Sequence, residues 1–149
     1  MNQVIFHLAF PIGNIAQTKQ FYVDVLGCKA GRESPNSIIL NFYGNQLVGH
    51  ITPGIFTRQQ GIYPRHFGLI FVELNDWQDF LERIKLHKLN FYQEPRIRFA
   101  GTPLEHHTFF LEDPFYNLLE LKYYLHASAI FGQSDFSSVG DEVSFSGVQ

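Results

Sequence analysis

The feature that most constrains this chain is an internal repeat, in which a strand-like segment followed by a helix-like segment occurs twice. The first copy spans the apolar run 4–10 and the helix-like run 15–26, and the second spans 66–72 and 76–88. Apolar residues recur in both helix-like runs with the spacing of an amphipathic helix. Three pairs of positions share an offset of 59 residues (66 − 7, 80 − 21 and 84 − 25), namely His7 with His66, Phe21 with Phe80 and Val25 with Ile84. We interpret the repeat as a duplication that places a histidine at the same position of both copies.

Turn and cap residues divide each copy into further elements. The first copy predicts a strand at 4–10, a helix at 15–26 capped by Asn14, and strands at 28–32, 37–43 and 46–52. The second copy predicts a strand at 66–72, a helix at 76–88 capped by Asn75, and strands at 90–93, 107–112 and 117–124. The shared order predicts an α+β fold class, with two β-α-β-β-β modules in tandem whose curved, mostly antiparallel sheets surround a cleft.

The chain length suits one domain made of these two modules. We expect a single domain over 1–124, with modules at about 4–52 and 65–124 joined by a linker at 53–64 that is rich in Pro and Gly. Residues 125–149 form a Ser-rich and Gly-rich extension with apolar residues spaced along it. We expect this extension to dock on the body of the protein or on a partner subunit.

Composition and charge exclude several classes of function. The net charge is −3, and the 11 Lys and Arg residues do not cluster as they do in nucleic-acid-binding proteins. The one cysteine, Cys28, cannot form an internal disulfide and suits a reducing compartment. No run approaches the roughly 18 apolar residues of a membrane span. We therefore expect a cytoplasmic protein that binds neither nucleic acid nor membrane.

The two repeated histidines suggest a metal site in the cleft between the modules. If His7 and His66 both point inward, pseudo-symmetry brings them together, and the last strand of the second module adds Glu120 from an apolar context. Two imidazoles and one carboxylate leave coordination positions open, as in non-haem iron sites. The simpler alternatives are hydrogen-bonded core histidines and a surface pair of Glu120 with Lys122.

Further residues are candidates for acid-base chemistry and for substrate contacts. His50, in the last strand of the first module, is the first choice for acid-base work because its ordinary pKa lies near ~6.5. One of His106 and His107 should face the cleft because strand side chains alternate, and we select His107. The insertion 94–105 carries two candidate anion-binding residues, Arg96 and Arg98.

The modules, the paired histidines and the ending Asp113-Pro114 to Glu120 resemble the vicinal oxygen chelate superfamily, which includes glyoxalase I, bleomycin resistance proteins and type I extradiol dioxygenases. The resemblance covers about residues 4–124. Four segments are similar to small bacterial proteins described as predicted extradiol-type dioxygenases, at 6–11, 42–50, 64–68 and 98–101. The resemblance implies that the metal ligands are His7, His66 and Glu120.

The chain departs from the family pattern at three places that matter for the reaction. Glyoxalase-like members carry a carboxylate ligand at about the place of His50. Extradiol dioxygenases carry an acid-base histidine and a tyrosine, and the nearest matches here are Asn45-Gln46 and Phe110. The resemblance still implies that Phe110 contributes to the substrate site. His50, His106 or His107 would then have to supply the acid-base function.

These observations predict a metal-dependent enzyme of the glyoxalase or extradiol dioxygenase type. It would bind a small substrate through two neighbouring oxygens on one divalent metal ion in the cleft, with Fe²⁺ favoured and Zn²⁺, Ni²⁺ or Mn²⁺ possible. The modules would pair within one chain or be exchanged between the subunits of a homodimer. The alternative is a metal-free protein that sequesters a small aromatic ligand, as bleomycin resistance proteins do.

Overall fold

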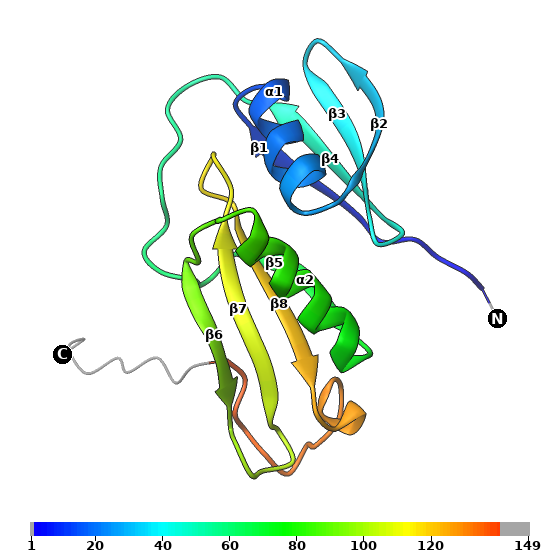
Figure 1. Ribbon diagram of the computed structural model, residues 1–149, viewed down its shortest axis with the longest axis vertical. Coiled ribbons are helices and arrows are strands. Elements are labelled where there is room, and N and C mark those ends of the chain that lie inside the picture. Colours follow the sequence, from blue (N-terminus) through cyan, green and yellow to red (C-terminus); the bar gives the residue numbers. More distant parts are fainter. Residues whose placement is uncertain (1, 141–149) are drawn as a thin grey trace.

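The computed structural model describes residues 2–140 and contains two four-stranded sheets (Figure 1). The first module consists of β1 (His7–Ile12), α1 (Ile15–Thr18), a π-helical continuation η1 (Lys19–Val25), β2 (Lys29–Ser34), β3 (Ser37–Phe42) and β4 (Asn45–Ile51). The second consists of β5 (Phe67–Phe71), α2 (Leu74–Leu86), β6 (Gln93–Arg98), β7 (His106–Glu112) and β8 (Leu118–Tyr124). A short 3-10 helix, η2 (Ala127–Ala129), follows β8.

Both sheets have the same topology, which confirms the predicted tandem β-α-β-β-β fold. The strand order is β1-β4-β3-β2 in the first sheet and β5-β8-β7-β6 in the second. The first and last strands of each module run parallel, and the other pairs are antiparallel. The parallel pairs place the start of β1 beside β4 and the start of β5 beside β8.

Three local predictions differ from the structure. The first strand, predicted at 4–10, is β1 at His7–Ile12. The helix α2 begins after Glu73 rather than at the predicted cap Asn75, and no side chain caps its first turn. The strand predicted at 90–93 lies instead at Gln93–Arg98, so β6 takes up the first part of the expected inserted loop 94–105, carries Arg96 and Arg98, and pairs with β7. Pro95 interrupts the apolar pattern there, and a register shift between Gln93 and Arg96 accommodates it. The predicted cap Asn14 is confirmed, since its side chain accepts a hydrogen bond from the Gln17 amide at 2.7 Å.

The helices of the two modules cover one face of each sheet and share one apolar core. The core includes Tyr22 from the first module together with Phe80 and Phe109 from the second. Trp77, on the buried face of α2, donates a hydrogen bond from Nε1 to the Leu121 carbonyl at 2.9 Å, which fixes α2 on β8. Burial of these large side chains supplies most of the driving force for folding.

One buried carboxylate joins the two modules at the turn between β7 and β8. Asp113, only 3% exposed, accepts bonds from the Phe115 and Asn117 amides at 2.8 Å and from the Asn117 side chain at 2.7 Å. The hydroxyl of Tyr22, in the helix of the first module, donates to the same carboxylate at 2.7 Å. Asn117 also donates to the Pro11 carbonyl of β1 at 2.8 Å. The Asp113 turn is therefore a polar connection inside the shared core.

A second connection lies where the two helices meet. Arg83 of α2 donates from Nε to the Val25 carbonyl at 2.6 Å and from a terminal nitrogen to the Asp24 carbonyl at 2.9 Å. These carbonyls end the helix of the first module and have no partner in the next turn. An arginine of one module thus caps the helix of the other.

The C-terminal segment passes across the face of the second sheet that α2 leaves open (Figure 1). Residues 129–140 line a pocket together with side chains of β6, β7 and β8. Of the apolar residues expected to dock, Val143 and Phe145 lie outside the described residues, whereas Phe131 and Val139 are almost fully exposed. No helix among residues 2–140 combines the length and the apolar character needed to cross a membrane.

The connection between Tyr22 and Asp113 predicts a clear loss of stability when the hydroxyl is removed. Tyr22→Phe retains the ring and its packing but leaves one buried carboxylate oxygen short of a donor. We expect the free energy of unfolding to fall by about 1–3 kcal/mol, measured by chemical denaturation. Tyr43→Phe, at an exposed site, is the matched control and should change stability by less than about 0.5 kcal/mol. Equal effects of the two variants would contradict the role given to this bond.

Candidate functional site

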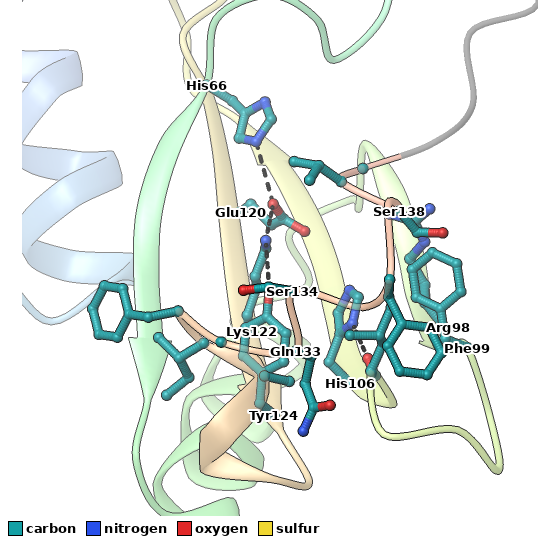
Figure 2. A pocket seen from close by; sticks show the side chains of 18 of the residues that line it. His66, Arg98, Phe99, His106, Glu120, Lys122, Tyr124, Gln133, Ser134 and Ser138 are labelled. Carbon is teal, nitrogen blue, oxygen red and sulfur yellow. Dashed lines mark hydrogen bonds and ion pairs between the residues drawn. The ribbon is translucent and has the colours of Figure 1, made fainter.

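The pocket on the open face of the second sheet holds four of the eight predicted site residues, namely His66, Arg98, Phe110 and Glu120. It has a volume of about 350 Å³ and lies between strands β6 to β8 and residues 129–140 (Figure 2). Alternate side chains of β7 and β8 point toward it because strand side chains have a period of two. These are His106, Thr108 and Phe110 from β7, and Glu120, Lys122 and Tyr124 from β8.

His66 and Glu120 form the centre of this pocket. His66, directly before β5, places Nε2 at 3.2 Å from Oε1 of Glu120. Its other nitrogen, Nδ1, lies 2.7 Å from the Ile62 carbonyl and must donate to it, since a carbonyl only accepts. The second carboxylate oxygen of Glu120 accepts a bond from the Thr108 hydroxyl at 2.6 Å. Backbone and hydroxyl partners thus orient both candidate ligands.

Charge interactions shift the pKa values of this pair in opposite directions. The hydrogen bond to Glu120 raises the pKa of His66 above its ordinary value, and burial opposes part of that rise. Burial of Glu120 opposes its ionisation, but the bond to His66 and the charge of Lys122 together hold the pKa of Glu120 below its ordinary value. Lys122 lies 3.4 Å from Oε1 of Glu120, so the two residues pair as the simpler alternative predicted, but Glu120 is buried rather than on the surface. The carboxylate is therefore ionised at neutral pH.

Close approach of β5 and β8 explains why a glycine follows His66 by two residues. Gly68 lies opposite Glu120 in the parallel pair, and any side chain at this position would overlap the Glu120 backbone. The equivalent pair in the first module is Ala9 with Val48. By this register Val48 occupies the place of Glu120, and His50, opposite Pro11, occupies the place of Lys122.

The predicted third ligand, His7, does not join the pair within one chain. It is exposed at the start of β1, where its Nδ1 lies 2.8 Å from Oε1 of Gln46. Among residues 2–140 there is no group of three His, Cys, Asp or Glu side chains arranged to hold a metal ion. The structure therefore brings together His66 and Glu120 but leaves His7 on the other sheet.

The remaining predicted site residues fall on three different surfaces. His107 lies on the helix-covered face of β7 with its ring 5.2 Å from the Trp77 ring, so its neighbour His106 is the histidine that faces the pocket. His50 is exposed on the first sheet. Phe110 packs its ring edge 5.1 Å from the His66 ring. Both arginines lie on β6. Arg98 lines the pocket, and a terminal nitrogen of Arg96 lies 3.5 Å from Oε1 of Gln93.

Sequence reasoning missed two parts of the site. It preferred His107 to His106, although counting back by twos from Phe110 places His106 on the Phe110 face. It also gave residues 129–140 no role in forming a pocket. No sequence pattern identifies that wall, because its polar and glycine-rich composition has no periodicity.

Comparison with known proteins agrees with the duplicated fold. Residues 4–121 match the Glyoxalase/Bleomycin resistance protein/Dioxygenase superfamily. No curated protein sequence gives a significant match. A glyoxalase/bleomycin resistance protein/dioxygenase from Alicyclobacillus acidocaldarius has a similar structure, with 40% sequence identity and a TM-score of 0.81 over 86% of this chain and 96% of that one.

More distant structures share the fold. A virulence protein from Salmonella typhimurium is 25% identical, with a TM-score of 0.59 over 84% of this chain and 99% of that one. A lactoylglutathione lyase from Agrobacterium tumefaciens is 14% identical, with a TM-score of 0.61 over 82% and 94% of the two chains. With the match over residues 4–121, the 40% identity and the duplicated fold, this chain belongs to the glyoxalase/bleomycin resistance protein/dioxygenase superfamily.

Proposed function

We propose that this protein is a metal-dependent enzyme of the glyoxalase or extradiol dioxygenase type, acting on a small molecule with two neighbouring oxygens. Its metal ligands would be His66 and Glu120 of one chain and His7 of a second copy. A divalent ion is required, with Fe²⁺ favoured and Zn²⁺, Ni²⁺ or Mn²⁺ possible for this ligand set.

The arrangement of His66 and Glu120 is the observation that carries the proposal. Nδ1 of His66 donates to the Ile62 carbonyl, so in the neutral ring Nε2 presents its lone pair to the Glu120 carboxylate at 3.2 Å. Two lone pairs at this distance require a proton or a cation between them. Metal-binding histidines and carboxylates are commonly held in place by a second hydrogen-bond partner. Here the Ile62 carbonyl accepts from Nδ1 of His66, and the Thr108 hydroxyl donates to Glu120. The residues present therefore fit a divalent ion.

A second copy is the source that we propose for the third ligand. His7 is the first residue of β1, and His66 directly precedes β5. Each histidine therefore lies at the start of a parallel strand pair, β1 with β4 or β5 with β8. Side chains on the face of the first sheet away from its helix are exposed or half-buried, including His7, Gln46 and His50. Packing this face on the pocket face of a partner would bring equivalent positions together by two-fold symmetry.

The residues of the chain have distinct tasks in such a site. A bound divalent ion would polarise substrate oxygens and lower their pKa. Glu120 holds a negative charge in a buried position, and Lys122 beside it favours an anionic substrate group. Phe110 packs beside His66 and limits access of water to that side. His50 of the partner subunit would lie two residues beyond Val48 on the same face, and it stays our candidate for acid-base work. His107 faces the helix side of β7 and takes no part in this site.

A metal-free binding protein is the second candidate, and one observation favours it. Lys122, Glu120 and His66 form a connected set in which a protonated histidine and a lysine balance the carboxylate without an ion. The aromatic walls Phe99, Phe110 and Tyr124 would then hold a small aromatic ligand. Metal content separates the two candidates.

Removal of a ligand should abolish metal binding. In protein purified without chelators and loaded with Fe²⁺ under anaerobic conditions, elemental analysis should find roughly one ion per chain. His66→Ala, Glu120→Gln and His7→Ala should each reduce this to roughly a tenth or less. His87→Ala, at the exposed residue directly after α2, is the control and should keep full occupancy. Unchanged stoichiometry in the ligand variants would show that the site is wrongly assigned.

The pKa of His66 predicts opposite effects of pH on the metal-free and the metal-bound protein. A histidine with a raised folded pKa contributes stability that is fully present below its unfolded pKa near ~6.5 and is lost as the pH rises through its folded pKa. Thermal denaturation of the metal-free protein should therefore show falling stability as the pH rises above about 6.5. Metal affinity should rise over the same interval because the ion displaces the proton.

Two variants test this assignment. His66→Gln should remove the fall in stability, whereas the exposed His126→Gln should leave it unchanged. A fall of the same size in His66→Gln would mean that another group titrates.

A further inference from the structure

We propose that His106 accepts a hydrogen bond from the hydroxyl group of a phenolic acid bound between the second sheet and residues 129–140. This inference goes beyond the proposed function, because it names a class of ligand that the same pocket binds without a metal ion. It adds a specificity-determining residue that lies apart from the three proposed metal ligands.

The surroundings of His106 leave one ring nitrogen without a partner. The side chain is only 4% exposed, and its ring packs 4.8 Å from the Tyr124 ring and 5.9 Å from the Phe99 ring. Nδ1 lies 3.0 Å from the Leu104 carbonyl and must donate to it. Nε2 is buried and has no hydrogen-bond partner among the residues that the structure describes. In the neutral ring, Nε2 therefore holds a free lone pair.

Burial, together with nearby positive charges, favours the neutral form of this ring. Burial lowers the pKa of His106 below its ordinary value, and the positive charges of Lys122 and Arg98 lower it further. A neutral ring with Nδ1 protonated can only accept at Nε2. Because a buried acceptor without a donor is costly, we infer that a donor arrives with the ligand.

Other residues that line the pocket indicate the class of ligand. Arg98 and Lys122 supply two positive charges, and Phe99, Phe110 and Tyr124 supply aromatic surfaces. Such walls suit a flat ring with an anionic group and one hydroxyl donor. A hydroxybenzoate meets all three requirements, with its carboxylate near the cations and its hydroxyl at Nε2 of His106.

Two substitutions separate the ligand contact from the structural bond. In His106→Asn the side-chain amide can still donate to the Leu104 carbonyl, but nothing replaces Nε2. In His106→Gln the side chain is long enough to place an amide oxygen near the position of Nε2, and the bond to Leu104 is lost. His106→Asn therefore removes the ligand contact and keeps the bond to Leu104. His106→Gln restores an acceptor for the ligand and loses that bond.

The probes are 3-hydroxybenzoate and 3-methoxybenzoate, titrated by calorimetry into the metal-free, full-length protein. Replacing the hydroxyl by a methoxy group removes the donor and keeps the ring and the carboxylate. We expect the wild-type protein to bind 3-hydroxybenzoate at least about tenfold more tightly. His106→Asn should bind both probes equally, and His106→Gln should recover part of the preference. The midpoint of thermal unfolding of the Asn variant should stay within about 3 °C of wild type.

Three results would overturn the proposal. One is that neither probe binds, and a second is that wild type does not distinguish them, as expected if a buried water satisfies Nε2. A third is that His106→Asn, folded as judged by its unfolding midpoint, keeps the preference. Because metal is removed before the titration, each result is independent of the metal content of the His66 variants. Failure of the phenolic-acid proposal and failure of the metal site are therefore distinguishable.

Discussion

Each sheet of this protein is covered by helices on only one face, and this constraint determines where chemistry is possible. The helices of both modules pack into one shared core, where Asp113 and Arg83 connect the modules through buried or helix-capping hydrogen bonds. The second faces of the sheets consequently point away from that core. On the second sheet this face carries His66, Glu120 and His106, and residues 129–140 form the outer wall of the pocket. The candidate site is thus a consequence of how the modules pack.

The same packing explains why one chain brings together only part of the predicted metal site. With the helices between them, the two open faces do not face each other, and His7 bonds to Gln46 rather than approaching Glu120. A homodimer in which the open faces pair would supply the missing imidazole and enclose the pocket. The extension at 129–140 already lies on one of these faces, so it would become part of the interface or move aside.

The repeat at an offset of 59 residues was sufficient to predict the topology, because hydrophobic periodicity and cap residues are local signals. It also identified Glu120 beside His66, since strand alternation places both on the open face. Register was harder to predict. Val48 rather than His50 occupies the place of Glu120, and β6 takes up the first part of the expected loop, because both depend on pairing with distant strands. His7 is separated from His66 and Glu120 because of how the two modules pack, and no local sequence pattern predicts that packing.

Subunit complementation tests the central claim most directly. His7→Ala and His66→Ala chains each lack one ligand, so neither homodimer should bind Fe²⁺. If a site combines His7 of one subunit with His66 and Glu120 of the other, a mixed dimer contains one intact site and one doubly substituted site. Co-refolding equal amounts should then restore about a quarter of the wild-type metal content in a random mixture. If no metal returns although mixed dimers form, His7 of the partner subunit is not a ligand and the proposed site is wrong.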